Sequence, residues 1–422
     1  MKTKALGRES FWKRYKYSAI VFVFIFLYNF FYVNSGNLWE VSGYAYTLHL
    51  VDFSVGFHTG VLPGAVFYGL FGKYASKTAV SIYVLVLLTI FMLILSVLVG
   101  KIITEFMDRK NINSLWLVLF FLVGPYTIAN CFYWFAFFDM YIFLISILFF
   151  AFLENRVTVC FIPVLFVISV LIHFSSFLTC IPLFTIVLLY KTIQEEPQNR
   201  KFKLILGISL FLTITVGIYL LLFESTNLRY SLEQFHDLLS KRGGADYASD
   251  DRAYYDYLFY HTVTVDADIS FSDGWDASKS ALANLVSYFI GYIRFNYDLM
   301  TMNGYEWMLQ EAMRLVVTLP FFGGFYLFII RFIKQKGIHK KTIGPLLPLL
   351  LTLLQFPVAL IAILFSTDIM RWINMTITAL IIELIYFAYN DRDFSISIEA
   401  FIERNRIWLL AYLFITATSI IK

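Results

Sequence analysis

Apolar residues in this chain fall into long uncharged runs that are separated by short polar connections. A helix needs about 20 apolar residues to cross the roughly 30 Å hydrocarbon core of a bilayer, and it satisfies its own backbone hydrogen bonds there. The pattern therefore predicts an all-α, polytopic transmembrane helical bundle with about eleven spans. We place these spans at 17–34, 78–100, 114–130, 132–153, 157–173, 174–190, 204–223, 313–333, 344–365, 371–389 and 407–421.

One uncharged stretch, 157–190, is too long for a single span, and His173 lies at its middle. A short helical hairpin accommodates this stretch, with the turn at His173. We expect His173 at the outer tip of that hairpin.

Composition supports lipid as the solvent for most of the chain. Of the 422 residues, 59% are hydrophobic and only 15% are charged, which is more apolar than a soluble core requires. We therefore interpret 1–422 as a single integral membrane domain. The three cysteines, Cys131, Cys160 and Cys180, lie in apolar runs and are expected to be small buried side chains, so we expect neither a metal nor a cofactor.

The placement of positive charge predicts the orientation. Most of the 33 Lys and Arg residues lie in the N-terminal tail and in short connections such as 331–341, which the positive-inside rule assigns to the cytoplasm. The tail 1–17 is basic and has no signal-peptide cleavage pattern, so we expect it to be a retained cytoplasmic tail. Two long segments, 34–77 and 224–312, are then extracytoplasmic. Within the first, 56–72 is expected to form an amphipathic or re-entrant element.

Three titratable side chains are candidates for catalysis. Asp52 lies between apolar neighbours in the first outer segment, where it is either a base or acceptor-binding group, or a structural cap or ion pair. Asp139 interrupts an apolar run, and a carboxylate there costs several kcal/mol unless it faces a partner or a cavity. His173, with Ser175 and Ser176, is either a helix-turn cap or part of a site.

Several further residues are candidates for substrate binding. Asp368 and Arg371 stand three positions apart, so they can pair with each other. A guanidinium is also suited to bidentate contact with phosphate, which makes Arg371, Arg294 and Arg314 candidates for a phosphate clamp, with interfacial anchoring as the alternative. His58 in the first outer segment completes the set.

Several common motifs are absent from the sequence. It contains no Walker loop, no Rossmann glycine fingerprint, no His-Glu-x-x-His and no Gly-x-Ser-x-Gly. ATP-driven transport, dinucleotide chemistry, zinc proteolysis and serine hydrolysis therefore lose support. The energy for any reaction must come with the substrate or from a gradient.

The aromatic-rich spans, the acidic first outer segment and the large late outer segment resemble bacterial Wzy-type and EpsG-type repeat-unit polymerases of O-antigen and capsule assembly. The most specific likeness is the string Leu171-Ile172-His173-Phe174-Ser175-Ser176-Phe177, which is similar to the family's histidine-plus-small-residue element. The chain departs from the EpsG-type pattern before this hairpin, where it has Phe138-Asp139-Met140 in place of an arginine that commonly opens the span.

The resemblance implies a glycosyltransferase of the bacterial inner membrane. Its substrate would be an undecaprenyl-diphosphate-linked oligosaccharide, transferred on the extracytoplasmic face to the non-reducing sugar of a second one. Asp52, His173 or Asp139 would act as catalytic groups, and the arginines would stabilise the departing diphosphate. Membrane lipid and a chain-length regulator are the implied partners, and nucleic acid is not.

Three other functions stay open at this level. A C-type glycosyltransferase that moves one sugar from a polyprenyl monophosphate suits Asp52 equally well. A flippase or transporter for a lipid-linked glycan would need a polar path through the spans. A membrane acyltransferase would use a histidine such as His173.

Overall fold

The computed structural model describes residues 8–33, 41–54, 60–72, 75–124, 128–133, 135–194, 199–223, 232–246, 320, 323–337, 343–363 and 369–419. Every regular element within these ranges is helical and none is a strand, which confirms the predicted all-α class. The elements in chain order are α1 (Arg8–Tyr28), η1 (Asn29–Val33), α2 (Gly43–Leu48), α3 (Leu62–Phe71), α4 (Lys77–Asp108), α5 (Leu115–Val123), α6 (Ile128–Tyr133), α7 (Phe138–Leu153), η2 (Thr158–Phe161), α8 (Ile162–Ile172), η3 (Phe174–Phe177), α9 (Cys180–Gln194), α10 (Asn199–Phe223), α11 (Leu232–Gly243), η5 (Gly244–Asp246), a helix over 323–336, α15 (Ile343–Ile363), α16 (Ile369–Asn390), α17 (Arg392–Arg404) and α18 (Arg406–Ser419).

Within the described ranges, three helices are long and apolar enough to cross a bilayer. They are Lys77–Asp108, which is α4, Ser175–Gln194, which contains α9, and Arg200–Leu220 within α10. Shorter apolar helices accompany them at Tyr15–Phe31, Leu62–Phe71, Phe138–Leu153, Thr158–Ile172, Gly344–Val358 and Met375–Asn390.

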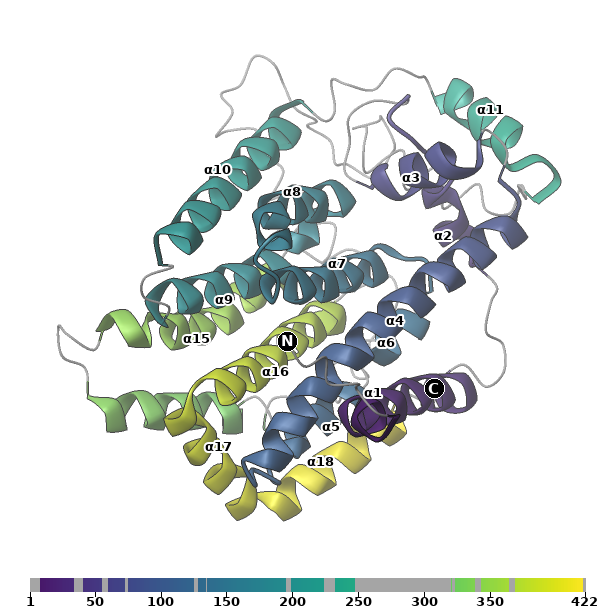
Figure 1. Cartoon of the computed structure of the whole chain (residues 1–422). Helices are drawn as coiled ribbons and strands as arrows, with labels where there is room; N and C mark the ends of the chain where they lie inside the picture. The colour runs from purple at the N-terminus through teal and green to yellow at the C-terminus, as the bar shows by residue number, and fades with distance from the viewer. Residues whose placement is uncertain are drawn as a thin grey trace, which may run out of the picture.

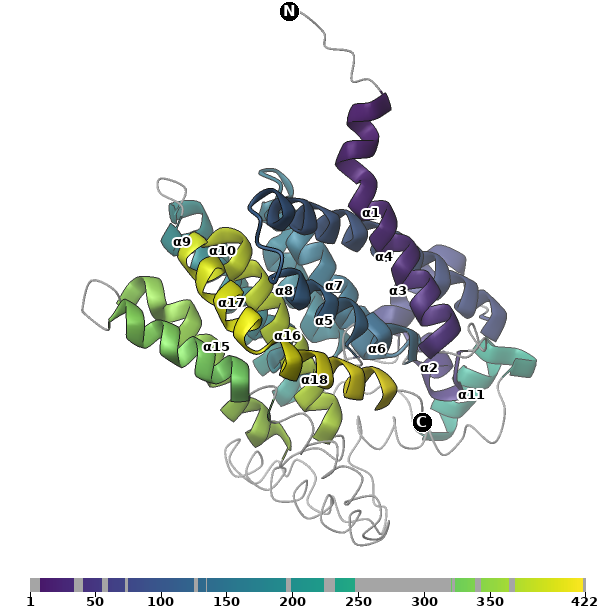
Figure 2. The same ribbon diagram turned by 90° about the horizontal axis from the view of Figure 1, so that it is seen from below.

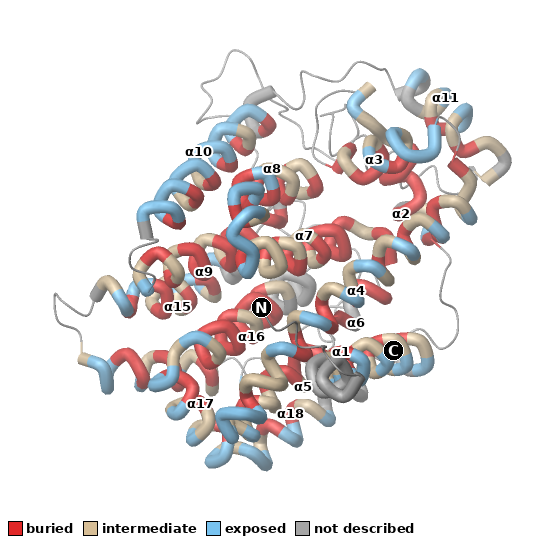
Figure 3. The backbone as a smooth tube through the Cα atoms, viewed as in Figure 1, coloured by how far each residue is buried: buried red, intermediate tan, exposed pale blue. Residues whose placement is uncertain are grey.

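Helix α4 shows why an apolar helix of this kind belongs in lipid. One stripe of its side chains is buried against the bundle, and the opposite stripe is apolar and exposed. The exposed stripe comprises Ile82, Val86, Ile90, Leu93 and Val97. This spacing of three to four residues places them on one helix face, and an apolar face of that size is stable only in contact with lipid or another apolar surface. Figure 3 shows a similar exposed outer face along α10.

The helices form one bundle with different elements at its two ends. Figures 1 and 2 place α2, α3 and α11 at one side of the bundle, beside the N-terminal end of α4, with α15 and α17 at the opposite side. Helix α1 packs closely along α4 because Gly100 has no side chain, and a Cβ there would clash with Ser18. Helices α7, α9 and α16 lie between these two sides.

The turn expected at His173 is present. Helix α8 ends at Ile172, His173 is extended with φ −167° and ψ 143°, and the short helix η3 leads into α9. The predicted span 114–130 differs, because α5 ends at Val123, with Gly124 as its C-cap, and a separate helix, α6, starts at Ile128.

Helix α17 was not predicted, since its polar residues gave it the character of a connecting loop. It is amphipathic, and Phe394, Ile398 and Ile402 form its buried face. Glu399 on this helix accepts the backbone N–H groups of Asn113 and Ser114, both at 2.8 Å. These are donors that the start of α5 leaves without an intrahelical partner, so α17 caps α5.

The two outer segments of the sequence analysis come together in space. Helix α11 and η5, from the second segment, dock at the start of α4. The Ala75 N–H donates to the Arg242 carbonyl at 3.1 Å, and the Lys77 N–H donates to Asp246 Oδ2 at 2.9 Å. The Tyr46 hydroxyl lies within hydrogen-bond distance of the Ala75 carbonyl and, at 3.3 Å, of the Gly243 carbonyl. Only 232–246 of the segment 224–312 belongs to the described residues.

Candidate functional site

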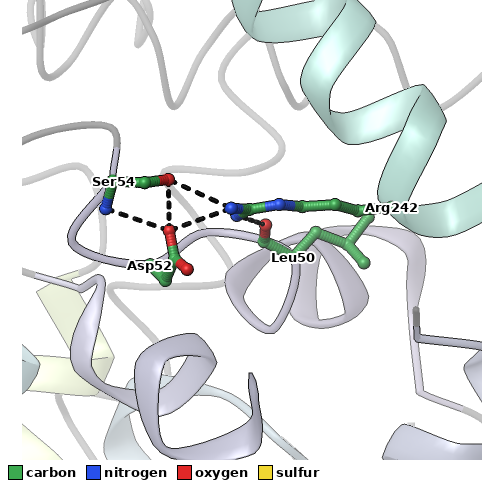
Figure 4. Close-up of polar contacts among 4 residues, drawn as sticks. All are labelled: Leu50, Asp52, Ser54 and Arg242. Atoms are coloured by element: carbon green, nitrogen blue, oxygen red, sulfur yellow. Dashed lines mark hydrogen bonds and ion pairs between the residues drawn. The ribbon is translucent and has the colours of Figure 1, made fainter. Parts of the chain in front are cut away.

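Asp52 lies on the turn that follows α2 and faces α11. Its Oδ1 atom accepts hydrogen bonds from the Ser54 N–H at 3.0 Å, from the Ser54 hydroxyl, and from Arg242 Nη2 at 3.1 Å (Figure 4). An Asp that binds the backbone two residues ahead forms an Asx turn, which fixes the local chain direction. The ion pair that the sequence left open for Asp52 is therefore present, with Arg242 as the partner.

Arg242 fixes this turn from the other outer segment. Its Nη1 donates to the Leu50 carbonyl at 2.7 Å, and its Nη2 also donates to Ser54 Oγ at 3.0 Å. The guanidinium lies 4.7 Å from the centroid of the Tyr68 ring, a cation–π contact. Because its side chain is only 14% exposed, these contacts are only weakly screened by water.

The electrostatics keep this carboxyl group ionised. Burial raises the pKa of Asp52, but hydrogen bonds from Ser54 and the positive charge of Arg242 outweigh that effect, and the pKa falls below its usual 3.8. Burial raises the pKa of Tyr68 to about 12, which Arg242 opposes and Asp52 reinforces. Asp52 Oδ2 forms no hydrogen bond within the described ranges, and 23% of the Asp52 side chain is exposed. One oxygen is thus fixed and the other is available to a ligand.

Two glycines position the Asp52 turn. A Cβ at Gly64 of α3 would clash with the Val51 carbonyl oxygen, so only glycine allows α3 to pack this closely behind the turn. Gly60 has φ +85°, and its N–H donates to the Leu171 carbonyl at 2.9 Å. The first outer segment is therefore joined to the hairpin two residues before His173.

His173 caps the short helix η3. Its Nδ1 accepts the Ser175 N–H at 3.1 Å and lies 2.8 Å from the Ser175 hydroxyl. A ring nitrogen that accepts a backbone N–H carries no proton, so the neutral ring has its proton on Nε2. The ring packs on Phe138, with centroids 4.8 Å apart. In this tautomer His173 presents a donor at Nε2 rather than a base.

Asp139 occupies a buried position at the start of α7, with 4% of the residue exposed. Backbone N–H groups of a first helical turn stabilise a carboxylate. Asp139 lines a cavity of about 50 Å³ together with Thr179 of α9 and Thr378 of α16. The two threonine hydroxyls are polar groups in a cavity whose other lining residues are mostly apolar. The neighbouring Phe138 brings Asp139 and His173 to the same corner of the bundle.

The structure does not unite all the candidate residues. Among the described residues, Ser54 and Arg242 are the hydrogen-bond partners of Asp52, and neither His173 nor Asp139 is one of them. Arg371 lies in the first turn of α16, and its side chain is outside the description. The predicted residues His58, Arg294, Arg314 and Asp368 also lie outside the described residues.

Sequence reasoning gave no specific role to His49, which is fully buried. Its Nδ1–H donates to the Ala45 carbonyl at 2.7 Å, and its Nε2 accepts the Tyr141 hydroxyl at 2.5 Å. Burial lowers the pKa of His49 to about 4, although the hydrogen bond to Ala45 raises it. This neutral imidazole links the first outer segment to α7, two residues from Asp139. The sequence around His49, just after α2, did not indicate its contact with Tyr141, which lies 92 positions further along the chain.

Sequence reasoning also gave Arg242 no specific role, because its partner Asp52 lies 190 positions away in the chain. Within the ranges that the structure describes, no group of three or more His, Cys, Asp and Glu side chains is arranged to hold a metal ion. No protein-family model, curated protein or solved structure matches this chain.

Proposed function

We propose that this chain is a glycosyltransferase of about eleven membrane spans that polymerises undecaprenyl-diphosphate-linked oligosaccharide repeat units on the outer face of the bacterial inner membrane. The observation that carries the proposal is the carboxylate of Asp52. One of its oxygens is fixed by Arg242 and Ser54, and the other has no hydrogen-bond partner among the described residues. Such a group can bind the hydroxyl of an acceptor sugar at the edge of an apolar bundle.

The proposed reaction exchanges one carbon–oxygen bond for another. The hydroxyl oxygen of the acceptor's non-reducing sugar bonds to the anomeric carbon of the donor glycan. The bond from that carbon to the diphosphate oxygen breaks, and undecaprenyl diphosphate leaves with the electron pair. The hydroxyl proton passes first to the base and then to solvent or to the leaving diphosphate.

Asp52 has the role of orienting the acceptor hydroxyl and taking its proton. The depressed pKa makes it a weak base, so the proton moves only as the new bond forms and the hydroxyl becomes acidic. Arg242 is a positioning residue here, because its contacts with Leu50, Asp52 and Ser54 fix the carboxylate.

His173 has a different role from the base considered in the sequence analysis. Since Nδ1 accepts the Ser175 N–H, the proton on Nε2 is suited to donate to an anionic oxygen of the leaving group. Arg294, Arg314 and Arg371 stay the predicted diphosphate clamp, with His58 and Asp368 as further predicted substrate contacts.

A lipid-linked substrate suits the apolar groove beside α7. The groove, of about 100 Å³, is lined by residues of α4, α5, α7 and α16, including Leu98, Phe121 and Ile385. It shares Phe143 and Ile382 with the cavity of Asp139. The shared residues place the groove beside that cavity, which supports a polyprenyl tail that runs along α7.

The distribution of charge supports the proposed orientation. Asp52 and α11 lie at the N-terminal end of α4, whereas Arg109, Arg156, Lys191 and Lys201 lie at the ends of helices on the other side of the bundle. The positive-inside rule assigns the basic end to the cytoplasm.

Cysteine labelling tests this orientation. A Ser240→Cys variant on α11 should react with an impermeant thiol reagent in intact cells, and a Lys201→Cys variant should not. Both need a Cys160→Ser background, because Cys160 is exposed, contrary to the burial expected from the sequence, whereas Cys131 and Cys180 are buried. The opposite pattern would place Asp52 inside and contradict the proposal.

Deletion of the gene tests the function in cells. We expect the surface polysaccharide to shorten to a single repeat unit and to recover on complementation with wild-type protein but not with Asp52→Asn. A polymer of normal length that lacks one side-branch sugar would instead identify a single-sugar transferase. Unchanged polysaccharide would contradict both.

A further inference from the structure

A buried carboxyl group lies inside the bundle, away from the Asp52 site. Glu383 is on α16 with none of its surface exposed. Its Oε2 lies 2.6 Å from Thr352 Oγ1, and its Oε1 accepts Gln355 Nε2 at 2.6 Å. Thr352 and Gln355 are three residues apart on α15, so both face α16.

The partners of Glu383 are all uncharged. Within the described ranges, its hydrogen bonds come only from Thr352 and Gln355, and no Lys, Arg or His side chain pairs with it. An ionised carboxylate buried in an apolar interior without a cation costs several kcal/mol, whereas a neutral carboxylic acid costs far less. Neutral partners therefore favour the acid form.

The hydrogen-bond geometry also accommodates the acid form. Thr352 Oγ1 lies 3.1 Å from the Pro348 carbonyl as well as 2.6 Å from Glu383. A hydroxyl has only one hydrogen to donate. If Glu383 is protonated, its O–H donates to Thr352 Oγ1 and the Thr352 hydroxyl donates to the Pro348 carbonyl, so each of these two hydroxyl hydrogens has an acceptor.

The elements packed around this site carry few titratable groups near it. Helix α15 contains none, and Tyr326 from the helix over 323–336 is in electrostatic contact with Glu383. Tyr190 of α9 packs on Tyr386 and Phe387 further along α16. Lys191 lines a polar cavity at the end of α9. None of these described groups forms an ion pair with Glu383.

Helix α15 contains two prolines close to this site. Pro348 and Pro357 lie inside the helix on either side of Thr352 and Gln355. A proline removes a backbone N–H and disturbs the preceding turn, so the segment between the two prolines can adjust to α16. Gln355 Oε1 is buried and has no hydrogen-bond partner among the described residues, which leaves one acceptor in the site unused.

We propose that Glu383, Thr352 and Gln355 form a proton-binding site within the bilayer, with the proton on the Glu383 carboxyl at neutral pH. The proton lets α15 and α16 join through neutral hydrogen bonds. The two helices flank the connection 364–368, so the site supports the helix pair that carries Arg371. Roughly 18 Å of helix separates the two positions on α16, at 1.5 Å per residue. The inference does not depend on the transferase proposal.

Infrared spectroscopy of the purified full-length protein tests this directly. A carboxylic acid and a carboxylate have separate C=O stretching bands. We expect an acid band at neutral pH that is lost in Glu383→Gln, while the variant stays folded because an amide keeps one donor and one acceptor. Glu399→Gln is the matched control, since it removes a carboxyl that accepts three hydrogen bonds at the start of α5 and should leave the acid band unchanged.

Two outcomes would overturn the proposal. One is a Glu383→Gln difference spectrum that lacks an acid band and shows only the loss of carboxylate bands. The other is loss of the acid band when Na⁺ is added at constant pH, which would identify a metal-cation site. The readout requires no substrate, so failure of the transferase proposal would not affect it.

If Glu383→Gln fails to fold, carbodiimide labelling of carboxyl groups in the wild-type protein replaces the comparison. Labelling at Glu383 supports the bound proton, and labelling confined to other carboxyl groups contradicts it.

Discussion

Arg242 Nη2 lies 3.1 Å from Asp52 Oδ1, and this contact joins the two outer segments of the chain. The side chains are 14% and 23% exposed, so we expect a stronger coupling than for a surface pair. A double-mutant cycle of Asp52→Asn and Arg242→Met should give a coupling energy of about 1–2 kcal/mol in unfolding measurements on detergent-solubilised protein.

The pair formed by Lys241 and Asp237 is the control, because it lies on the same helix and is 71% and 60% exposed. Its cycle should give almost no coupling. Equal coupling in the two cycles would show that the Arg242 contact has no special role in docking α11.

Gly64 and Gly69 lie on the same helix but meet different surroundings. A Cβ at Gly64 would clash with the Val51 carbonyl, whereas a Cβ at Gly69 meets nothing within 4 Å. Gly64→Ala should therefore destabilise the protein by about 1–3 kcal/mol and displace the Asp52 turn. Gly69→Ala should be neutral or slightly stabilising. Thermal unfolding of the two purified variants measures the difference, and equal melting temperatures would contradict the proposed packing of α3.

His49 should make stability depend on pH. Its pKa is about 4 in the folded protein and 6.5 when unperturbed, so between these values the unfolded chain binds a proton that the folded chain does not. Stability then falls as pH decreases through this window, by about 1.4 kcal/mol per pH unit. His49→Gln should remove this slope below pH 6.5 when unfolding is measured against pH. A slope equal to that of the wild type would assign the effect to other groups.

Asp52 acts in a different pH window. Its folded pKa lies below 3.8, so the stabilisation from its ion pair is complete above that pH and is lost only as the pH falls through the folded value. Losses between pH 6.5 and 4 therefore belong to His49 rather than to Asp52.

His173 caps η3 through Nδ1, and we propose that its Nε2–H donates to the leaving group. A single substitution can separate these two roles. Asparagine is a good helix cap, so His173→Asn should still accept the Ser175 N–H and preserve protein abundance. It lacks the Nε2–H donor, so polymer formation should fall by about 10²–10³-fold. Normal polymer from this variant would leave His173 with the capping role alone.

The sequence predicted the all-α class because lipid imposes a length and an apolar composition on each span. It also located the turn at His173, where a polar residue interrupts a long apolar stretch. It missed α17, because the spacing of Phe394, Ile398 and Ile402 supplies only a narrow apolar face. Sequence spacing also carries no information about contacts between distant segments. For that reason Arg242 had no assigned partner and Glu383 was overlooked within its span.

The candidate site was predicted only in part. Asp52 was identified as the acidic residue of interest, and the structure supplies the ion pair that the sequence left as an alternative. The tautomer of His173 follows from one contact, the backbone N–H of Ser175 that its Nδ1 accepts. Contacts of this kind follow from backbone geometry at a turn, which residue type alone does not determine.

Reconstitution in lipid vesicles can show whether the purified protein polymerises repeat units by itself. Purified protein supplied with an undecaprenyl-diphosphate-linked repeat unit, and with no nucleotide sugar, should produce a ladder of polymer lengths on a gel. Asp52→Asn at equal protein amount should reduce the rate by about 10²–10⁴-fold. Absence of any ladder from folded wild-type protein, or an Asp52→Asn variant as active as the wild type, would contradict the account.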